Sequence, residues 1–319
     1  MICVLRLLTC HKVVKSVIPN FANSKSMKIR ERITFKKSVF IFLVFTLGVI
    51  FHFILTSPKE IQTSSILALD GDLVKGERVF YAAGCGSCHV GSDSSKNLLL
   101  AGGTQFETQF GTFYAPNVSM SKEYGIGKWS SEDFYRAIKL GQNPEGKHYY
   151  PVFPYTSYSR MSDQDIMDLW RFWKTLPVSD EPSKEHKLFL PFNMRSNIGV
   201  WKSLFMKEEF VGDKENPSTY LVEALAHCSE CHTPRNMFGA MKTKQWMRGA
   251  SNPSGKGKIP SIHPDDLKWT KEEIAEYLSS GLTPNYDVAG GNMALVVANL
   301  SKLKNEDLLL IASYIKNVK

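Results

Sequence analysis

Two short runs of this 319-residue sequence share the same residue types at the same spacing. They are Cys85-Gly-Ser-Cys88-His89 and Cys228-Ser-Glu-Cys231-His232. In this order, two thiols can add across the two vinyl groups of one porphyrin while the adjacent imidazole binds its iron, which is the attachment pattern of a c-type haem. The sequence therefore predicts two covalently bound haem c groups, with His89 and His232 as iron ligands.

Two other uses of a Cys-x-x-Cys pair fit poorly. In a paired zinc site the second pair usually follows about 15 to 20 residues later, whereas Cys88 and Cys228 are 140 positions apart and each run has its own histidine. A thioredoxin-like dithiol needs a βαβ context and no following histidine. Haem attachment is the interpretation that explains both runs.

An iron already held by histidine needs a sixth ligand to be a pure electron carrier, and methionine in that place raises the reduction potential. Met293 is well placed for the second iron, twelve residues beyond Gly281 and shortly before the last predicted helix. At the same distance from Gly141, the first half has Phe153. The pattern therefore breaks where coordination is decided.

The first half offers three solutions for its iron. We favour Met161, which comes directly before Ser162 at the start of a predicted helix. The same position also suits an apolar residue that packs under a helix start. His148 and an open or otherwise ligated iron are the alternatives.

Three further side chains are candidates for contacts with the haem propionates. Trp129 and Trp269 occupy matched positions, and an indole N–H can donate a hydrogen bond inside a haem pocket. Arg235, which follows the second motif closely, can pair with a carboxylate. Core packing for the tryptophans and a solvated surface position for the arginine are the competing interpretations.

The segments after the two motifs repeat a helical pattern. Trp129-Ser-Ser-Glu-Asp133 resembles Trp269-Thr-Lys-Glu-Glu273, and each has a hydroxyl residue three positions before an acid, which is a capping box. Both predicted helices stop at a glycine, Gly141 and Gly281. Strand signals are sparse, so we expect a mainly α-helical chain that contains the same small unit twice.

An apolar run from 39 to 55, extended by Ser38 and Thr56, is just long enough to cross a bilayer. Basic residues lie ahead of it, so the positive-inside rule leaves the N-terminus in the cytoplasm and sends the rest across. The run is long for a signal peptide and no clear small-x-small site follows it, which favours an uncleaved anchor over a cleaved signal. We expect a single-pass protein of a bacterial inner membrane with its haem domains in the periplasm.

The net charge of +8 comes from the N-terminus, because residues 1–37 carry nine Lys or Arg and one Glu. Of the 39 basic and 31 acidic residues in the chain, 30 of each lie in the remainder and cancel. The basic composition therefore does not imply a nucleic-acid partner.

At this point the sequence resembles the membrane-bound cytochrome c subunits of bacterial quinohaemoprotein alcohol dehydrogenase, gluconate dehydrogenase and related periplasmic dehydrogenases. The resemblance covers roughly residues 70–319. The phrases that carry it are Tyr114-Ala-Pro-Asn117, Gly125-Ile-Gly-Lys-Trp129, Phe153-Pro-Tyr-Thr-Ser-Tyr158, Met161-Ser-Asp163, Pro191-Phe-Asn-Met-Arg195 and Cys228-Ser-Glu-Cys-His-Thr-Pro-Arg-Asn236. It implies two tandem class I cytochrome c domains that receive electrons from a catalytic subunit and pass them to quinone or a soluble carrier.

With this resemblance we divide the chain into a basic cytoplasmic N-terminus (1–37), a transmembrane anchor (38–56), a first cytochrome c domain (66–178), a linker (179–216) and a second cytochrome c domain (217–319). The better-known subunits carry three haem motifs and this chain two, which argues against direct quinone reduction.

The expected function is electron transfer from a periplasmic dehydrogenase to the respiratory chain, by way of a soluble cytochrome, an oxidase or quinone. We expect an electron-transfer subunit with no catalytic residues of its own. The alternatives are a dihaem subunit of a haem-copper oxidase, and a haem enzyme that reacts with peroxide or thiosulfate at an open first iron, as Phe153 suggests.

Overall fold

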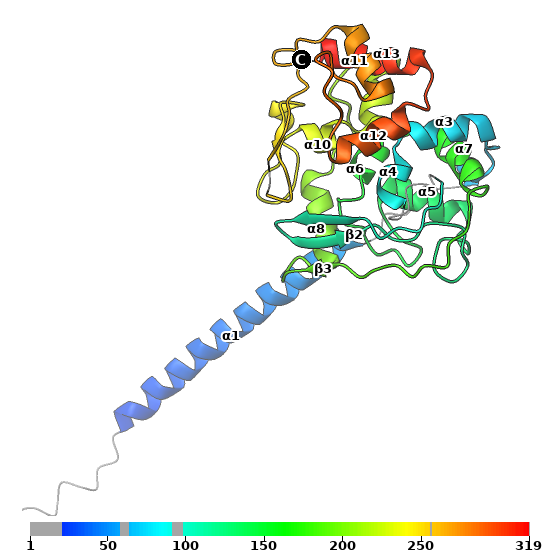
Figure 1. Ribbon diagram of the computed structural model, residues 1–319. Coiled ribbons are helices and arrows are strands. Elements are labelled where there is room, and N and C mark those ends of the chain that lie inside the picture. Colours follow the sequence, from blue (N-terminus) through cyan, green and yellow to red (C-terminus); the bar gives the residue numbers. More distant parts are fainter. Residues whose placement is uncertain (1–20, 58–63, 91–97, 256, 319) are drawn as a thin grey trace, which may run out of the picture. The chain divides into compact units, whose positions relative to one another are not determined.

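The computed structural model describes residues 21–57, 64–90, 98–255 and 257–318. Helices dominate them, which confirms the prediction of a mainly helical chain (Figure 1). The helices are α1 (Phe21–Thr56), α2 (Ser64–Leu67), α3 (Leu73–Ala82), α4 (Cys85–His89), α5 (Ser131–Leu140), α6 (Tyr155–Tyr158), α7 (Asp163–Trp173), α8 (Ser196–Phe205), α9 (Pro217–Tyr220), α10 (Ser229–His232), α11 (Lys271–Ser280), α12 (Asn292–Leu300) and α13 (Asn305–Asn317), with a π-helical turn η1 (Leu221–Ala226) and a 3₁₀ turn η2 (Thr243–Gln245).

Short antiparallel strands accompany the helices. Strands β1 (Gln105–Thr108), β2 (Gly111–Tyr114) and β3 (Lys187–Leu188) form one sheet in that order, and β4 (Ala250–Ser251) pairs with β5 (Lys258–Ile259). Strand β3 belongs to the segment 179–216 that the sequence predicts as a linker, and it pairs with β2 through Leu188 and Gly111. This segment is therefore attached to the first half by backbone hydrogen bonds.

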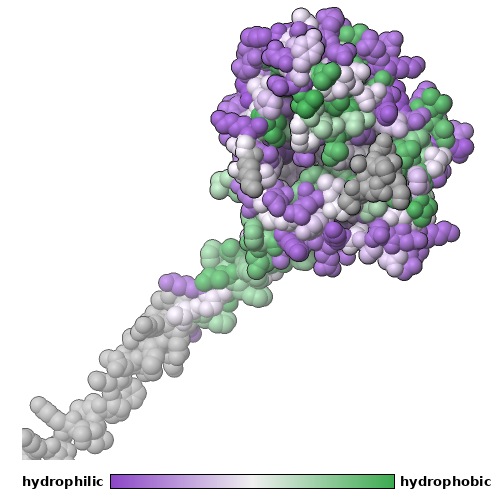
Figure 2. Space-filling view, in the orientation of Figure 1, coloured by the Kyte–Doolittle hydropathy of each residue, from purple (hydrophilic) through white to green (hydrophobic). Residues whose placement is uncertain are grey.

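The described residues form two compact units, one up to Leu55 and one from Thr56 onward. In the first unit, the large apolar side chains of α1 between Phe35 and Ile54 are exposed, and Figure 2 shows an apolar surface there. The segment Thr34–Thr56 has the length and composition to cross a membrane, and a signal sequence passes the same test. Anchoring by 38–56 stays a prediction, and residues 1–20 of the predicted basic N-terminus lie outside the described part.

In the first half of the larger unit, helices α3 and α7 pack side by side (Figure 1). The ring of Phe80 on α3 lies 5.4 Å from that of Phe172 and 5.7 Å from that of Trp173, between centroids. Gly76 lets the two backbones approach, because a Cβ there would overlap the carbonyl of Asp168. This packing fixes the end of α3, where the first Cys-x-x-Cys-His motif begins.

In the second half, α13 packs against α11 and also against α9 and η1, which precede the second motif as α3 precedes the first. Both predicted capping boxes are present, and they join Ser130 to Asp133 at α5 and Thr270 to Glu273 at α11. The two helices end as predicted at Gly141 and Gly281, which adopt left-handed conformations with φ of +58° and +78°. The repeated helical pattern is therefore found in the structure.

Side chains from both halves meet within the larger unit. Arg78 on α3 forms a two-bond ion pair with Asp307 on α13, and the hydroxyl of Tyr220 donates to the carboxylate of Asp165. The residues from Thr56 onward cluster as one body, so the domain limits 66–178 and 217–319 stay predictions.

Candidate haem sites

The first motif folds into a one-turn helix. Helix α3 stops before Gly84, whose φ of +61° turns the chain, and α4 then carries Cys85, Cys88 and His89. Positions separated by three and four residues lie on one face of a helix. The local fold therefore presents both thiols and the imidazole on the same side, and both cysteines are free of disulfides.

The second motif repeats this arrangement with a different residue at the turn. His227, with φ of +41°, precedes Cys228 as Gly84 precedes Cys85, and helix α10 follows. Burial raises the pKa of the Cys88 and Cys228 thiols to about 12, so both are protonated before they react.

Both motif histidines are held by a proline carbonyl. Nδ1 of His89 lies 2.9 Å from the carbonyl oxygen of Pro116, and Nδ1 of His232 lies 2.8 Å from that of Pro260. A carbonyl only accepts hydrogen bonds, so Nδ1 carries the proton and Nε2 keeps the lone pair that binds iron. Burial lowers the pKa of both imidazoles, which favours this neutral form. The donor set thus fits two c-type haems.

A backbone bond common to both halves ties each motif to the loop beyond it. The amide of Gly102 donates to the carbonyl of His89, and the amide of Gly249 donates to that of His232, each at 2.7 Å. The two motifs therefore sit in matching frames.

In the first half, the side chain of Asn117 holds the loop that carries Pro116. Its amide group donates to the carbonyls of Ser179 at 2.8 Å and Glu181 at 2.7 Å. Asn117 is almost fully buried, and these acceptors follow helix α7. The segment 179–181 therefore positions the carbonyl that orients His89.

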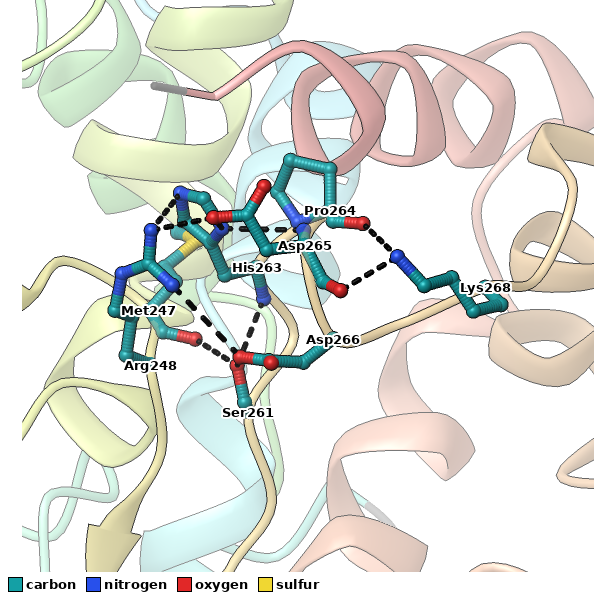
Figure 3. A network of polar contacts seen from close by, with 8 residues as sticks. All are labelled: Met247, Arg248, Ser261, His263, Pro264, Asp265, Asp266 and Lys268. Atoms are coloured by element: carbon teal, nitrogen blue, oxygen red, sulfur yellow. Dashed lines mark hydrogen bonds and ion pairs between the residues drawn. The ribbon is translucent and has the colours of Figure 1, made fainter.

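In the second half, a polar network holds the loop that carries Pro260 (Figure 3). The hydroxyl of Ser261 donates to the carboxylate of Asp266 at 2.7 Å, and Arg248 pairs with Asp265 at 2.7 Å. The hydrogen bond from Arg248 lowers the pKa of Asp265, so this carboxyl is ionised at neutral pH. The same task is thus performed by different side chains in the two halves.

The two attachment turns meet at one backbone oxygen. The hydroxyl of Tyr158 donates to the carbonyl of Ala83 at 2.6 Å, and Nε2 of His227 lies 3.2 Å from the same oxygen. Ala83 is two residues before Cys85, and His227 comes directly before Cys228. The start of one motif is therefore in contact with the start of the other.

The predicted sixth ligands occupy different environments. Met293 is half-buried at the start of α12, and Met161 is fully buried directly before the cap of α7. His148 has partners at both ring nitrogens, the carbonyl of Thr56 at 2.9 Å and the ammonium of Lys202 at 3.2 Å. The positions of these three side chains do not show whether any of them binds iron. Met293, Met161 and His148 therefore stay predicted sixth ligands.

The three residues predicted to contact the haem propionates also differ in their surroundings. Trp129 and Trp269 are half-buried against the core, and within the described part of the chain neither indole N–H has a protein acceptor. Arg235 instead pairs with the carboxylate of Glu230 and donates to the carbonyl of Gly239 at 2.7 Å. The propionate roles stay predictions, and the guanidinium of Arg235 already has a carboxylate partner.

Sequence reasoning missed the role of Glu230, inside the second motif. Its carboxylate accepts hydrogen bonds from Thr156, Ser157 and Arg235, so it joins helix α6 of the first half to the second motif. Burial opposes ionisation of Glu230, but the charge of Arg235 and the bond from Thr156 hold its pKa below the ordinary value. No local pattern signals the link to helix α6, because Thr156 and Ser157 lie 74 and 73 positions away.

The sequence analysis also missed Glu223, whose carboxylate is fully buried in η1. Glu223 accepts from the amides of Val211 and Gly212 at 2.7 Å and from the hydroxyl of Tyr314 at 2.6 Å. A glutamate among apolar residues directly ahead of a haem motif was the available signal.

No family model matches the chain. A dihaem c-type cytochrome of Cereibacter sphaeroides is 46% identical over 271 residues, which cover 83% of this chain and 92% of the relative. A nicotinate dehydrogenase subunit of Pseudomonas putida is 33% identical over 262 residues, 77% of this chain and 21% of the relative. The cytochrome subunit of a fructose dehydrogenase of Gluconobacter japonicus is 31% identical over 257 residues, 76% of this chain and 52% of the relative.

The chain thus spans nearly all of the dihaem cytochrome but about half or less of the two dehydrogenase subunits. These similarities confirm the resemblance drawn from the motifs. The chain belongs to the c-type cytochrome family that contains this dihaem protein and the cytochrome subunits of fructose, gluconate and quinone-dependent alcohol dehydrogenases.

Proposed function

We propose that this protein is a membrane-anchored electron carrier with two covalent haem c groups, which takes electrons from a periplasmic dehydrogenase and passes them to the respiratory chain. The observation that carries the proposal is the pair of equivalent motifs in which a proline carbonyl holds Nδ1 of the histidine, at 2.9 Å for His89 and 2.8 Å for His232. Haem bound at such a site supplies a one-electron iron couple.

The chain's own residues attach, orient and enclose the two groups. Cys85 and Cys88 hold the first group, and Cys228 and Cys231 hold the second. Cys85 is buried, Cys88 and Cys228 are half-buried, and Cys231 is exposed. The shared contact at the Ala83 carbonyl keeps the two attachment turns adjacent. This closeness supports electron exchange between the haems inside one chain.

Haem content of the full chain, matured with its haems and purified in detergent, tests the proposal. We expect two c-type haems per chain in a pyridine haemochrome assay. Replacing Cys85 and Cys88 together by alanine, or Cys228 and Cys231 together, is expected to leave one. A full chain with a single haem, or with haem that organic solvent extracts, would contradict it.

The donor, the acceptor and the location in a bacterial inner membrane are part of the same proposal. Relatives named as cytochrome subunits of dehydrogenases support a catalytic dehydrogenase subunit as donor. The apolar segment Thr34–Thr56 supports anchoring. A soluble cytochrome, an oxidase or quinone is the proposed acceptor.

Affinity purification from membranes checks these partners. We expect the chain to stay in the pellet after an alkaline carbonate wash, and a dehydrogenase to co-purify whose substrate reduces the haems. Co-purification with haem-copper oxidase subunits instead would favour the alternative of an oxidase subunit. A chain released by carbonate would disprove the anchor and leave the haem assignment standing.

A further inference from the structure

The loop after α5 and the loop after α11 have the same backbone hydrogen bonds. The amide of Tyr149 donates to the carbonyl of Gly141, and the amide of Ala289 donates to that of Gly281, both at 2.8 Å. The two halves can therefore be aligned residue by residue from these glycines, with no gap up to this point.

This alignment places Phe153 where the second half has Met293. Both are twelve residues beyond their glycine, and both close the same turn, in which the amide of Phe153 donates to Tyr150 at 3.1 Å and that of Met293 to Gly290 at 3.2 Å. Both side chains are half-buried. A phenyl ring has no lone pair to give to iron, so the position that suits a ligand in one half cannot supply one in the other.

Met161 aligns instead with Leu303. The amide of Met161 donates to Tyr158 and the amide of Leu303 to Leu300, each at 2.9 Å, directly before the cap of the last helix in its half. Leucine in the equivalent place supports a packing role for this position.

The packing role of Met161 has a clear partner. Met161 precedes the cap Ser162, and Ile166 is the fourth residue of α7; both Met161 and Ile166 are completely buried. An apolar residue before the cap that packs against the fourth helical residue is a hydrophobic staple. Met161 therefore has a structural task of its own.

His148 aligns with Val288, since each forms the isolated bridge that follows its glycine turn. Its Nε2 lies 2.9 Å from the carbonyl of Thr56, which requires a proton on that nitrogen. Its Nδ1 faces the ammonium of Lys202 at 3.2 Å. Both ring nitrogens of His148 are therefore already engaged by protein groups.

We propose that the first haem receives no sixth ligand from Phe153, Met161 or His148, so that its distal side is an open site for a small uncharged ligand such as a diatomic gas. The ring of Phe153 lies among those of Tyr149 at 5.9 Å, Tyr158 at 5.8 Å and Tyr155 at 6.2 Å, between centroids. Aromatic surroundings suit an uncharged molecule. The inference rests on the proposed attachment of haem at Cys85, Cys88 and His89.

The buried hydroxyl of Tyr155 adds an independent observation. Tyr155 is fully buried, and its hydroxyl oxygen has no hydrogen-bond partner among the residues that the structure describes. A buried donor without a partner is costly and is rarely left so. A small ligand that reaches this hydroxyl would provide the missing acceptor.

Carbon monoxide is the probe, added to the dithionite-reduced full chain with both haems attached and followed by absorption spectroscopy. We expect roughly half of the haem to bind the gas, because one iron of two is open. Met161→Leu, which copies the residue of the second half, is expected to leave this fraction unchanged. Phe153→Met is expected to reduce it by supplying the thioether, and Met293→Phe to open the second iron so that both haems bind.

A chain with two c-type haems that binds no carbon monoxide would overturn the inference and leave the proposed function intact. Carbon monoxide binding that appears only in Met161→Leu would identify Met161 as the ligand and also overturn it. A chain without c-type haem would overturn the proposed function itself. A far-red thioether band in half of the oxidised wild-type haem that is lost in Met293→Phe would identify Met293 as the ligand of the second iron. If carbon monoxide binding were then unchanged in Phe153→Met, Phe153 would not occupy the equivalent ligand position, and its role in the inference would be overturned.

Discussion

An imidazole can bind iron only through the nitrogen that carries no proton, so the other nitrogen must be held by an acceptor. His89 and His232 obtain this acceptor from proline carbonyls in loops that differ in sequence and in supporting side chains. Asn117 supports one loop, and Ser261 with Asp266 supports the other. The two halves therefore share the position of a backbone oxygen more closely than they share side chains.

Outside the haem sites, His186 links stability to pH. Its Nδ1 accepts a hydrogen bond from the amide of Tyr114 at 3.2 Å, and its ring packs against Phe113 and Tyr150. Burial, with a smaller effect of the Arg195 charge, lowers the pKa of His186 from its ordinary value of 6.5. Protonation of this side chain therefore opposes folding.

The sign of the effect follows from proton binding. Below pH 6.5 the unfolded chain takes up a proton at His186 before the folded chain does, so the stabilising contribution is complete above pH 6.5 and is lost as the pH falls towards the folded pKa. We expect His186→Gln, which keeps an acceptor for Tyr114, to make the free energy of unfolding less dependent on pH between about 5 and 7. Urea unfolding across that pH range measures this dependence. Equal slopes of the free energy of unfolding against pH in the variant and the wild type would contradict the prediction.

The sequence could predict candidate haem-binding side chains but not the groups that orient them. Cys85, Cys88 and His89 lie within five residues, so their geometry is local. Pro116 contributes a backbone oxygen 27 positions away, and every residue has such an oxygen. Glu230 depends on Thr156 in the other half, which only the packed chain brings near.

At the scale of elements, the equivalent helices α5 of the first half and α11 of the second half allow a matched experiment. Both helices end at a glycine with positive φ, but a Cβ at Gly141 would overlap the ring of Tyr155, whereas the atom nearest to a Cβ at Gly281 is 3.5 Å away. Gly281→Ala is expected to cost about 1 kcal/mol for the left-handed backbone alone. Gly141→Ala adds overpacking and is expected to cost about 3 kcal/mol.

Thermal or urea unfolding of the two alanine variants, each with its full haem content, measures the difference. An equal loss of free energy of unfolding in the two variants would mean that the ring of Tyr155 moves aside without destabilising the protein. A larger cost for Gly281→Ala would contradict the packing argument outright.

The predictable elements were those with local signals. A hydroxyl residue three positions before an acid marks the start of α5 and of α11, and both capping boxes are present. Strand β3, which lies in the predicted linker 179–216, could not be predicted because a two-residue strand has no sequence periodicity of its own. The buried Glu223 of the π-helical turn η1 is satisfied by groups outside the turn.

At the scale of the whole molecule, the two halves that carry the Cys-x-x-Cys-His motifs form one body through polar contacts that the repeat does not encode. Arg160 donates to the carbonyl of Glu223 at 2.8 Å, and Thr156 donates to the carboxylate of Glu230. Asn299 reaches the hydroxyl of Ser87 at 2.9 Å. In each of these contacts, the residue from one half differs in type from its partner in the other half. The repeated sequence pattern therefore does not predict which residues form the interface between the halves.

The ion pair of Arg78 and Asp307 tests whether these contacts couple the halves. Its two bonds measure 2.7 and 2.9 Å, and the Asp307 side chain is 10% exposed, so the pair is shielded from solvent on one side. We expect a double-mutant cycle of Arg78→Ala and Asp307→Ala to give a coupling energy of about 1 to 2 kcal/mol in urea unfolding. The exposed pair Lys214 and Glu215, 3.6 Å apart, is the control and is expected to give nearly none. If the two cycles gave equal coupling, or if wild-type unfolding followed by backbone circular dichroism and by haem absorption did not coincide, the halves would be independent domains that only touch.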